Sequence, residues 1–160
     1  MWAVVKLTIP YLAMMALSRD FREFLIALND HGVEYLLVGG YAVAYHGYPR
    51  ATKDMDIWVA PRIEIAQRLV AALQAFGVPD PQIDPAWFVD PDSIFGIGNY
   101  PYRIEIFCAI PGVAFDDCYA RKIVEVIDGV SVPIISLDDL KANKRATARS
   151  QDLADLDHLP

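Results

Sequence analysis

The stretch LLVGGYAVAYHGYPRATKDMDI, residues 36–57, decides the fold of this chain because it joins two apolar runs through a glycine pair. The first run, 34–38, reads as a short strand. Gly39-Gly40 ends that strand and turns the chain into a short helix over 41–46. A second strand follows over 56–59. Strand, helix and strand in this order predict a sheet with helices packed against it.

The rest of the chain continues the alternation of helices and strands. We expect the class α/β (α+β), a mixed β-sheet flanked by helices, in a single domain over 1–160 that ends in a helical region, 137–160. Four prolines and four aspartates in 79–92 predict an irregular, exposed connection. The remaining expected helices are 18–29, 62–76 and 115–120, and the remaining expected strands are 94–97, 102–107, 123–127 and 130–135.

Composition limits the classes of function. With 54% hydrophobic and 22% charged residues, the chain is an ordinary globular sequence. A net charge of −7 makes extensive nucleic-acid binding not the default expectation, although a local basic cluster can still meet a small anion or an RNA end. Cys108 and Cys118 match no zinc spacing, so we expect reduced cysteines in the core of a cytoplasmic protein.

The N-terminal run, 1–16, is apolar but is interrupted by Lys6, Thr8 and Pro10. It is shorter than the roughly 20 apolar residues that a membrane span requires, so we expect no membrane segment there. Two interpretations stay open. The run is an extension that packs on the domain or on a partner chain, or translation starts at Met14 or Met15.

Two aspartates at the start of the second strand form a candidate metal site. Asp54 and Asp56 are two residues apart, so a strand directs both side chains to the same face. Carboxylates together with phosphate oxygens are the ligands that Mg²⁺ prefers. The alternative is a solvated pair, which costs little because water screens the repulsion.

A third carboxylate lies within an apolar strand. Glu105 alternates with Ile104 and Ile106, and a carboxylate buried in a central strand is costly unless it is paired or bound to a metal. The alternative is an edge strand with a solvated Glu105 paired to Arg103. Together, the two aspartates and Glu105 supply the acids of a two-metal site for phosphoryl transfer.

The glycine pair is a candidate anion site. Gly39 and Gly40 lie where a strand gives way to a helix, and the absence of side chains lets an anion approach the free N–H groups there. A tight strand-to-helix turn without a ligand is the alternative.

Two segments together resemble a known family. The block 36–57 is similar to the signature of the polymerase-beta-type nucleotidyltransferase superfamily, and the closest likeness is to the AbiEii-like branch of bacterial toxin nucleotidyltransferases. The tail supports this, because ISLDDLKANK (135–144) and RSQDLADL (149–156) resemble that branch's lysine helix and arginine–aspartate motif.

The resemblance implies roles for individual residues. Asp54 and Asp56 would bind two Mg²⁺ ions, with Mn²⁺ as a substitute, and Glu105 stands where the family places its third acid, commonly aspartate. Gly39 and Gly40 would form the phosphate-binding turn. The remaining implied nucleotide contacts are Lys141 or Lys144, which match the triphosphate-contacting lysine, and Arg50 and Thr52, which touch the phosphates or brace the loop.

The implied reaction is transfer of a nucleoside monophosphate from a nucleoside triphosphate to a hydroxyl of a protein or of a tRNA 3′ end. The branch also implies a toxin paired with an antitoxin protein. Two alternatives remain: a catalytically inactive module that binds nucleotide or a partner, and a metal-dependent nuclease. The nuclease is disfavoured because Glu105 is not followed by the acid-x-lysine pattern.

Asp152 and Asp155 are expected to brace Arg149 or nearby lysines.

Overall fold

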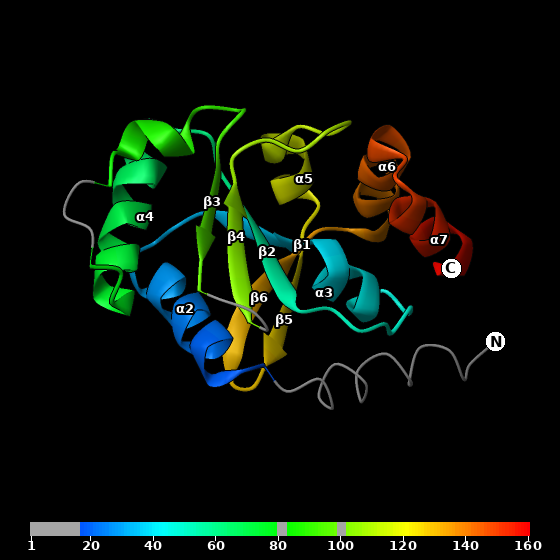
Figure 1. Cartoon of the computed structure of the whole chain (residues 1–160), viewed down its shortest axis with the longest axis horizontal. Coiled ribbons are helices and arrows are strands. Elements are labelled where there is room, and N and C mark those ends of the chain that lie inside the picture. The colour runs from blue at the N-terminus through cyan, green and yellow to red at the C-terminus, as the bar shows by residue number, and fades with distance from the viewer. Residues whose placement is uncertain (1–16, 80–82, 99–101) are drawn as a thin grey trace.

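The computed structural model describes residues 17–79, 83–98 and 102–160. The possible N-terminal extension, 1–16, lies outside them. Figure 1 shows one sheet between two layers of helices, which confirms the expected mixed sheet flanked by helices. The strands are β1 Tyr35–Val38, β2 Asp54–Val59, β3 Ile94–Ile97, β4 Arg103–Phe107, β5 Ile123–Ile127 and β6 Val130–Ile134. The helices are α2 Arg19–Asp30, α3 Gly39–Tyr45, α4 Ile63–Phe76, α5 Phe115–Ala120, α6 Leu137–Thr147 and α7 Ser150–His158.

The described strands form one sheet in the order β3-β4-β2-β1-β6-β5. β1 runs antiparallel to β2, whereas β2 runs parallel to β4 and β1 runs parallel to β6. The hairpins β3–β4 and β5–β6 form the two ends of the sheet. β2 and β4 are therefore interior strands, so the interpretation of Glu105 as an edge-strand residue is wrong.

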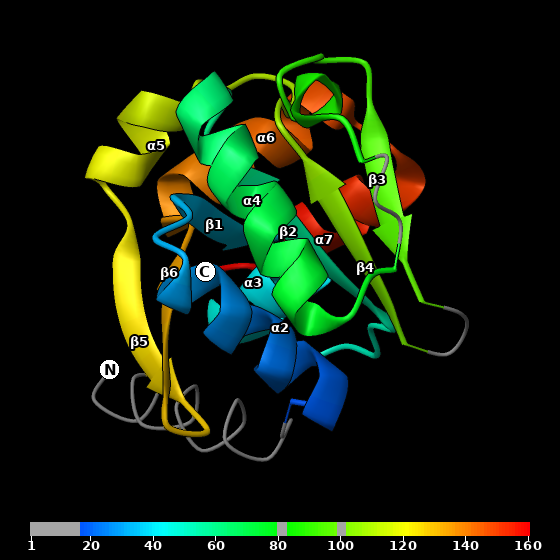
Figure 2. The ribbon, with the colours of Figure 1, turned by 90° about the vertical axis from the view of Figure 1, so that its left-hand side faces the viewer.

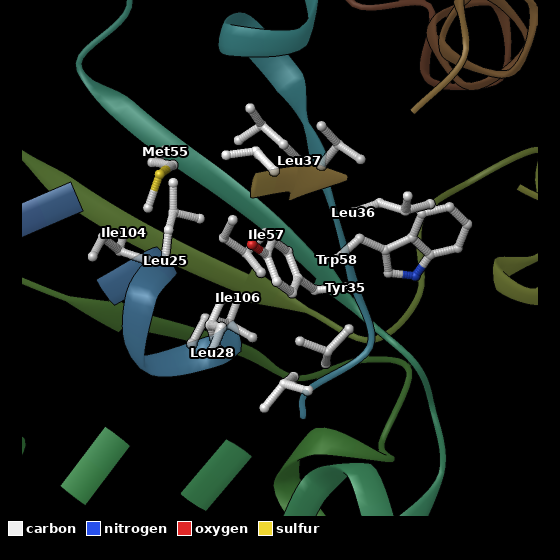
Figure 3. Packing of buried hydrophobic residues seen from close by; sticks show 14 of the residues in the cluster. Leu25, Leu28, Tyr35, Leu36, Leu37, Met55, Ile57, Trp58, Ile104 and Ile106 are labelled. Atoms are coloured by element: carbon white, nitrogen blue, oxygen red, sulfur yellow. The ribbon is translucent and has the colours of Figure 1, made fainter. Parts of the chain in front are cut away.

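Alternation along β2 and β4 gives the sheet two different faces. Met55 and Ile57 lie opposite Ile104 and Ile106 and are fully buried. Helices α2 and α4 cover this face, as Figure 2 shows with both helices in front of the sheet. The main core lies in this layer, where Leu25 and its neighbour Leu28 of α2 pack beside the isoleucines (Figure 3). The other face carries the carboxylates.

Helices α3, α6 and α7 lie on the side of the sheet away from α2 and α4 (Figure 1). α5 contributes Phe115, whose ring meets that of Trp58 edge-to-face at 5.2 Å between centroids. This contact closes one end of the second face, where Trp58 is buried. Cys108 and Cys118 are both buried and free, as expected.

Two helices, α2 and α6, begin at serine caps. Ser18 and Ser136 each accept a hydrogen bond from a backbone N–H of the first turn, at 3.2 Å. The C-terminal helical region is divided before Ser150 into α6 and α7. In the parts of the chain that the structure describes, no helix is long and apolar enough to cross a membrane.

The connection 79–92 is not irregular and exposed throughout, so that expectation is corrected. Pro85–Phe88 forms a 3₁₀ helix, η1, and the Asp84 side chain accepts a hydrogen bond from the Ala86 N–H at its start. Phe88 is buried and packs against Phe95 of β3 with 5.4 Å between ring centroids. The proline and aspartate that suggested a loop are the residues that begin this short helix.

Candidate active site

The three predicted acids lie on one face of two adjacent strands. Asp54 and Asp56 alternate along β2, and Glu105 of β4 is the direct register partner of Asp56. On the other side of β2, Asp56 pairs with Val38, the last residue of β1. The register therefore brings residues 49 positions apart in the sequence, Asp56 and Glu105, to adjacent places in the sheet.

The charge environment of Asp56 favours a bound cation. Burial, followed by the neighbouring charges of Glu105 and Asp54, raises the pKa of Asp56 to about 7, although Lys144 and Arg149 act in the opposite direction. The Oδ1 atom of Asp54 is buried and has no hydrogen-bond partner among the described residues. A buried carboxylate oxygen without a donor is an unfavourable arrangement that a cation would relieve.

The three acids do not yet form a closed ligand set. Across residues 17–79, 83–98 and 102–160, no group of three or more His, Cys, Asp or Glu side chains is arranged to hold a metal ion. Glu105 instead has its Oε1 atom 3.3 Å from the Nε atom of Arg103. The donor types and the unpartnered oxygen of Asp54 fit a divalent cation, and the three carboxylates would have to draw closer together to complete the set.

The glycine pair has a steric reason to be glycine. Gly39 begins α3 with φ +66°, and a Cβ atom there would overlap the Asp56 carboxylate. A Cβ atom at Gly40 would overlap the Thr52 side chain. Both glycines thus let α3 approach the loop and strand that carry the aspartates. The predicted phosphate-binding role of this turn stays a prediction.

The loop before the aspartates is tied to the C-terminal helices. Arg50 makes two hydrogen bonds to the fully buried Asp155 of α7, at 2.7 and 3.0 Å. Thr52 Oγ1 donates to the carbonyl oxygen of Asp54 at 3.3 Å. In these contacts Arg50 and Thr52 brace the loop, which is one of the two roles that the resemblance implies. Contact of either residue with a phosphate stays a prediction.

A buried ion cluster lies behind this loop. Lys144 of α6 is 4% exposed, and its Nζ atom lies 3.0 Å from both Asp152 and Asp155. Arg149 also bonds Asp152, at 2.9 Å. Burial acts to raise the pKa of Asp152, but hydrogen bonds from Arg149, Thr147 and Lys144 hold it well below its usual range. The expectation that Asp152 and Asp155 brace Arg149 and a lysine is confirmed.

The two candidate lysines differ in environment. Lys144 is buried, although the i, i+3, i+4 spacing of Lys141, Lys144 and Arg145 is typical of a solvated helix face, and its positive charge lowers the pKa of Asp56. Lys141 is half-buried, and its Nζ atom donates to the carbonyl oxygen of Pro160. Which of them contacts a triphosphate stays a prediction.

The residue that sequence reasoning underrated is Arg103. The sequence indicates Arg103 only as the partner of a solvated Glu105, yet it lies in register with Asp54 on an interior strand. Its position two residues before Glu105 on a strand was the available signal, because this spacing directs both side chains to one face. By contrast, His46 ends α3 as expected, with Nε2 2.7 Å from the carbonyl oxygen of Ile135.

Several solved structures are similar to this chain in fold. The chain is similar to a putative nucleotidyltransferase (TM1012) from Thermotoga maritima, with a TM-score of 0.60 and 17% identity over 87% of this chain and 89% of that one. It is also similar to the lincosamide antibiotic adenylyltransferase LnuA bound to lincomycin, with a TM-score of 0.52 and 15% identity over 89% and 96%. An antigenic nucleotidyltransferase-like protein from Paracoccidioides brasiliensis matches with a TM-score of 0.51 and 15% identity over 93% and 75%.

These likenesses show that the chain has the nucleotidyltransferase fold, as the block 36–57 predicted. No family model and no curated protein matches the sequence. The narrower resemblance, to the AbiEii-like toxin branch, therefore stays a prediction.

Proposed function

We propose that this protein is a metal-dependent nucleotidyltransferase that moves a nucleoside monophosphate from a nucleoside triphosphate to an acceptor hydroxyl. The observation that carries the proposal is the row of Asp54, Asp56 and Glu105 on one face of adjacent strands. The shared nucleotidyltransferase fold supports the same reaction class. Fold alone does not define chemistry, so the acidic row is the main argument.

Asp54 and Asp56 would hold divalent Mg²⁺ or Mn²⁺, and Glu105 would complete the set. When bound, the ions neutralise the charge of the triphosphate and make the acceptor hydroxyl more acidic. The acceptor oxygen bonds to the α-phosphorus, the bond to pyrophosphate breaks, and the hydroxyl proton passes to a carboxylate. We assign that proton to Glu105, whose side chain is 28% exposed and thus reachable from solvent.

Basic residues near the acids provide the positive charge that a triphosphate requires. Lys144 and Arg149 both lower the pKa of Asp56. The Arg149 side chain is 75% exposed and bonds Asp152. An exposed guanidinium fixed by a buried carboxylate is suited to meet a phosphate group, because a planar donor loses little freedom on binding. Gly39, Gly40, Thr52 and Lys141 complete the proposed nucleotide contacts.

The acceptor is proposed to be a hydroxyl of a protein or of a tRNA 3′ end, following the resemblance to toxin nucleotidyltransferases. The likeness to LnuA adds a third class, a hydroxyl of a small molecule, because this chain covers 96% of that adenylyltransferase. A toxin role with an antitoxin partner, and a cytoplasmic location, follow from the same resemblance.

Transfer of label tests the proposal. The protein is incubated with each α-³²P-labelled nucleoside triphosphate, Mg²⁺ and a cell extract, and the label is followed into protein, RNA and small-molecule fractions. We expect Mg²⁺-dependent label in one fraction, and its loss in Asp54→Asn. Asp20→Asn on α2, on the opposite layer, is the matched control and should keep full transfer. Hydrolysis of RNA or DNA without label transfer would favour the nuclease.

A second function has one observation in its favour. Glu105 is paired with Arg103, and the three acids form no closed ligand set among the described residues, which suits an inactive module that binds nucleotide or a partner protein. Nucleotide binding with no label transfer into any fraction would support this module and reject the enzyme.

A further inference from the structure

Arg103 occupies a defined place beside the acids. It is the register partner of Asp54 and shares a strand face with Glu105. Its guanidinium extends across the neighbouring strand, because a Cβ atom at Gly96 of β3 would overlap Nη2. Gly96 is itself the register partner of Glu105. Glycine at this position therefore provides the space that the Arg103 guanidinium fills.

Glu105 thus has a different neighbour on each side. On the neighbouring strand β2 lies Asp56, whose like charge repels that of Glu105. On the β3 side lies the guanidinium of Arg103, which covers Gly96 and has its Nε atom 3.3 Å from Oε1 of Glu105. An opposite charge on one side and a like charge on the other bias the Glu105 carboxylate toward Arg103.

We propose that Arg103 is a positioning residue: it is the counter-ion of Glu105 in the metal-free protein, and a divalent cation must displace Arg103 from Glu105 when it binds. The inference rests on the proposed metal-dependent function. It gives Arg103 a role in cation affinity, and it makes the arrangement of Glu105 dependent on whether a cation is bound.

The strength of the pair decides between a displaceable counter-ion and a permanent brace. The two side chains are 40% and 28% exposed, and Arg103 Nε makes no hydrogen bond within the described ranges, so the contact is an ion pair alone. The Nε atom is itself buried, but a partly exposed pair that makes no hydrogen bond is weaker than a buried, hydrogen-bonded one. Arg50 and the fully buried Asp155 show what a brace looks like here, with two hydrogen bonds of 2.7 and 3.0 Å.

Direct cation binding tests the role without any assay of activity. Mn²⁺ binding to the full chain is measured by titration calorimetry and by the electron paramagnetic resonance signal of free Mn²⁺. We expect Arg103→Gln to bind Mn²⁺ about fivefold more tightly, the equivalent of removing one weak ion pair. Arg103→Lys, which keeps the charge, should stay near wild type. Arg68→Gln on α4, with the same loss of charge in the opposite layer, should not change the affinity.

Two further variants separate the proposed role from a general charge effect. Gly96→Ala keeps every charge but moves the guanidinium off its site, so it should also tighten Mn²⁺ binding. In a Glu105→Gln background, Arg103→Gln should give no gain. The glycine variant also keeps the test decisive if Arg103→Gln does not fold.

Each outcome has one meaning. Wild-type protein that binds Mn²⁺, with unchanged or weaker affinity in Arg103→Gln and Gly96→Ala, overturns the role of Arg103 and leaves the proposed function intact. A gain that persists in Glu105→Gln overturns it as well. No Mn²⁺ binding by any variant overturns both this inference and the metal-dependent function.

Discussion

Neutralising Asp56 is expected to stabilise the metal-free protein at neutral pH and to abolish its stabilisation by metal. Its pKa rises from the ordinary 3.8 to about 7, first because of burial and then because of Glu105 and Asp54. Three pH units correspond to roughly 4 kcal/mol, which is the upper limit of the penalty for the ionised form in the folded state.

The sign of the pH dependence follows from that direction. A carboxyl whose pKa is raised by folding imposes no penalty below the unfolded value of 3.8. The penalty grows between 3.8 and about 7 and is complete above 7. We therefore expect the stability advantage of Asp56→Asn over wild type to be near zero at pH 4 and to reach up to roughly 4 kcal/mol at pH 8.

Urea unfolding in EDTA at pH 4, 5, 6, 7 and 8 measures this difference, with Asp20→Asn as the control for an exposed aspartate. Mn²⁺ should then stabilise wild type but not Asp56→Asn, because a ligand stabilises only the fold that binds it. An advantage for Asp56→Asn that is absent at pH 8, or equally large at pH 4, would refute the electrostatic account of this site.

Three other variants test the support of the site. Gly39→Ala should lower the free energy of unfolding by more than the roughly 1–2 kcal/mol that a left-handed residue costs, and it should weaken Mn²⁺ binding. Gly77→Ala, where φ is +109° and the space is open, should show the backbone cost alone, and equal losses of the two variants in urea unfolding would contradict this. Lys144→Met should destabilise by up to about 3–5 kcal/mol, since two buried carboxylates lose the cation they share and each keeps one arginine. A loss under about 1 kcal/mol would count against the buried cluster. Leu25→Ala, in the layer remote from the acids, should cost about 2–5 kcal/mol in thermal unfolding while the Mn²⁺ affinity stays unchanged, and a large fall in that affinity would place the site elsewhere.

The fold and the acidic row were predictable because local patterns define them. Alternation fixed the face of Asp54, Asp56 and Glu105, since a strand has a side-chain period of two. Apolar residues such as Ile57 and Ile106 mark the opposite face, which packs on the main core. The order of strand, glycine pair, helix and strand then restricted the topology to a mixed sheet.

Long-range pairing was not predictable from the same patterns. Nothing local to Arg50 indicates that Asp155, 105 positions later, will bind it. The spacing of Lys144 on its helix suited a solvated face, but burial depends on how α6 and α7 pack on each other and on the loop. The position of the Arg103 side chain was not predictable because it depends on Gly96, which only the β3–β4 register brings next to it.

The location of bound Mn²⁺ tests the central claim most directly. Crystals of the protein grown with Mn²⁺ and a non-hydrolysable nucleoside triphosphate analogue would be measured at the manganese absorption edge. We predict anomalous peaks in coordination contact with Asp54 and Asp56, with Glu105 turned toward them and the triphosphate on the same side. Manganese bound elsewhere on the molecule, with these carboxylates left without an ion, would contradict it.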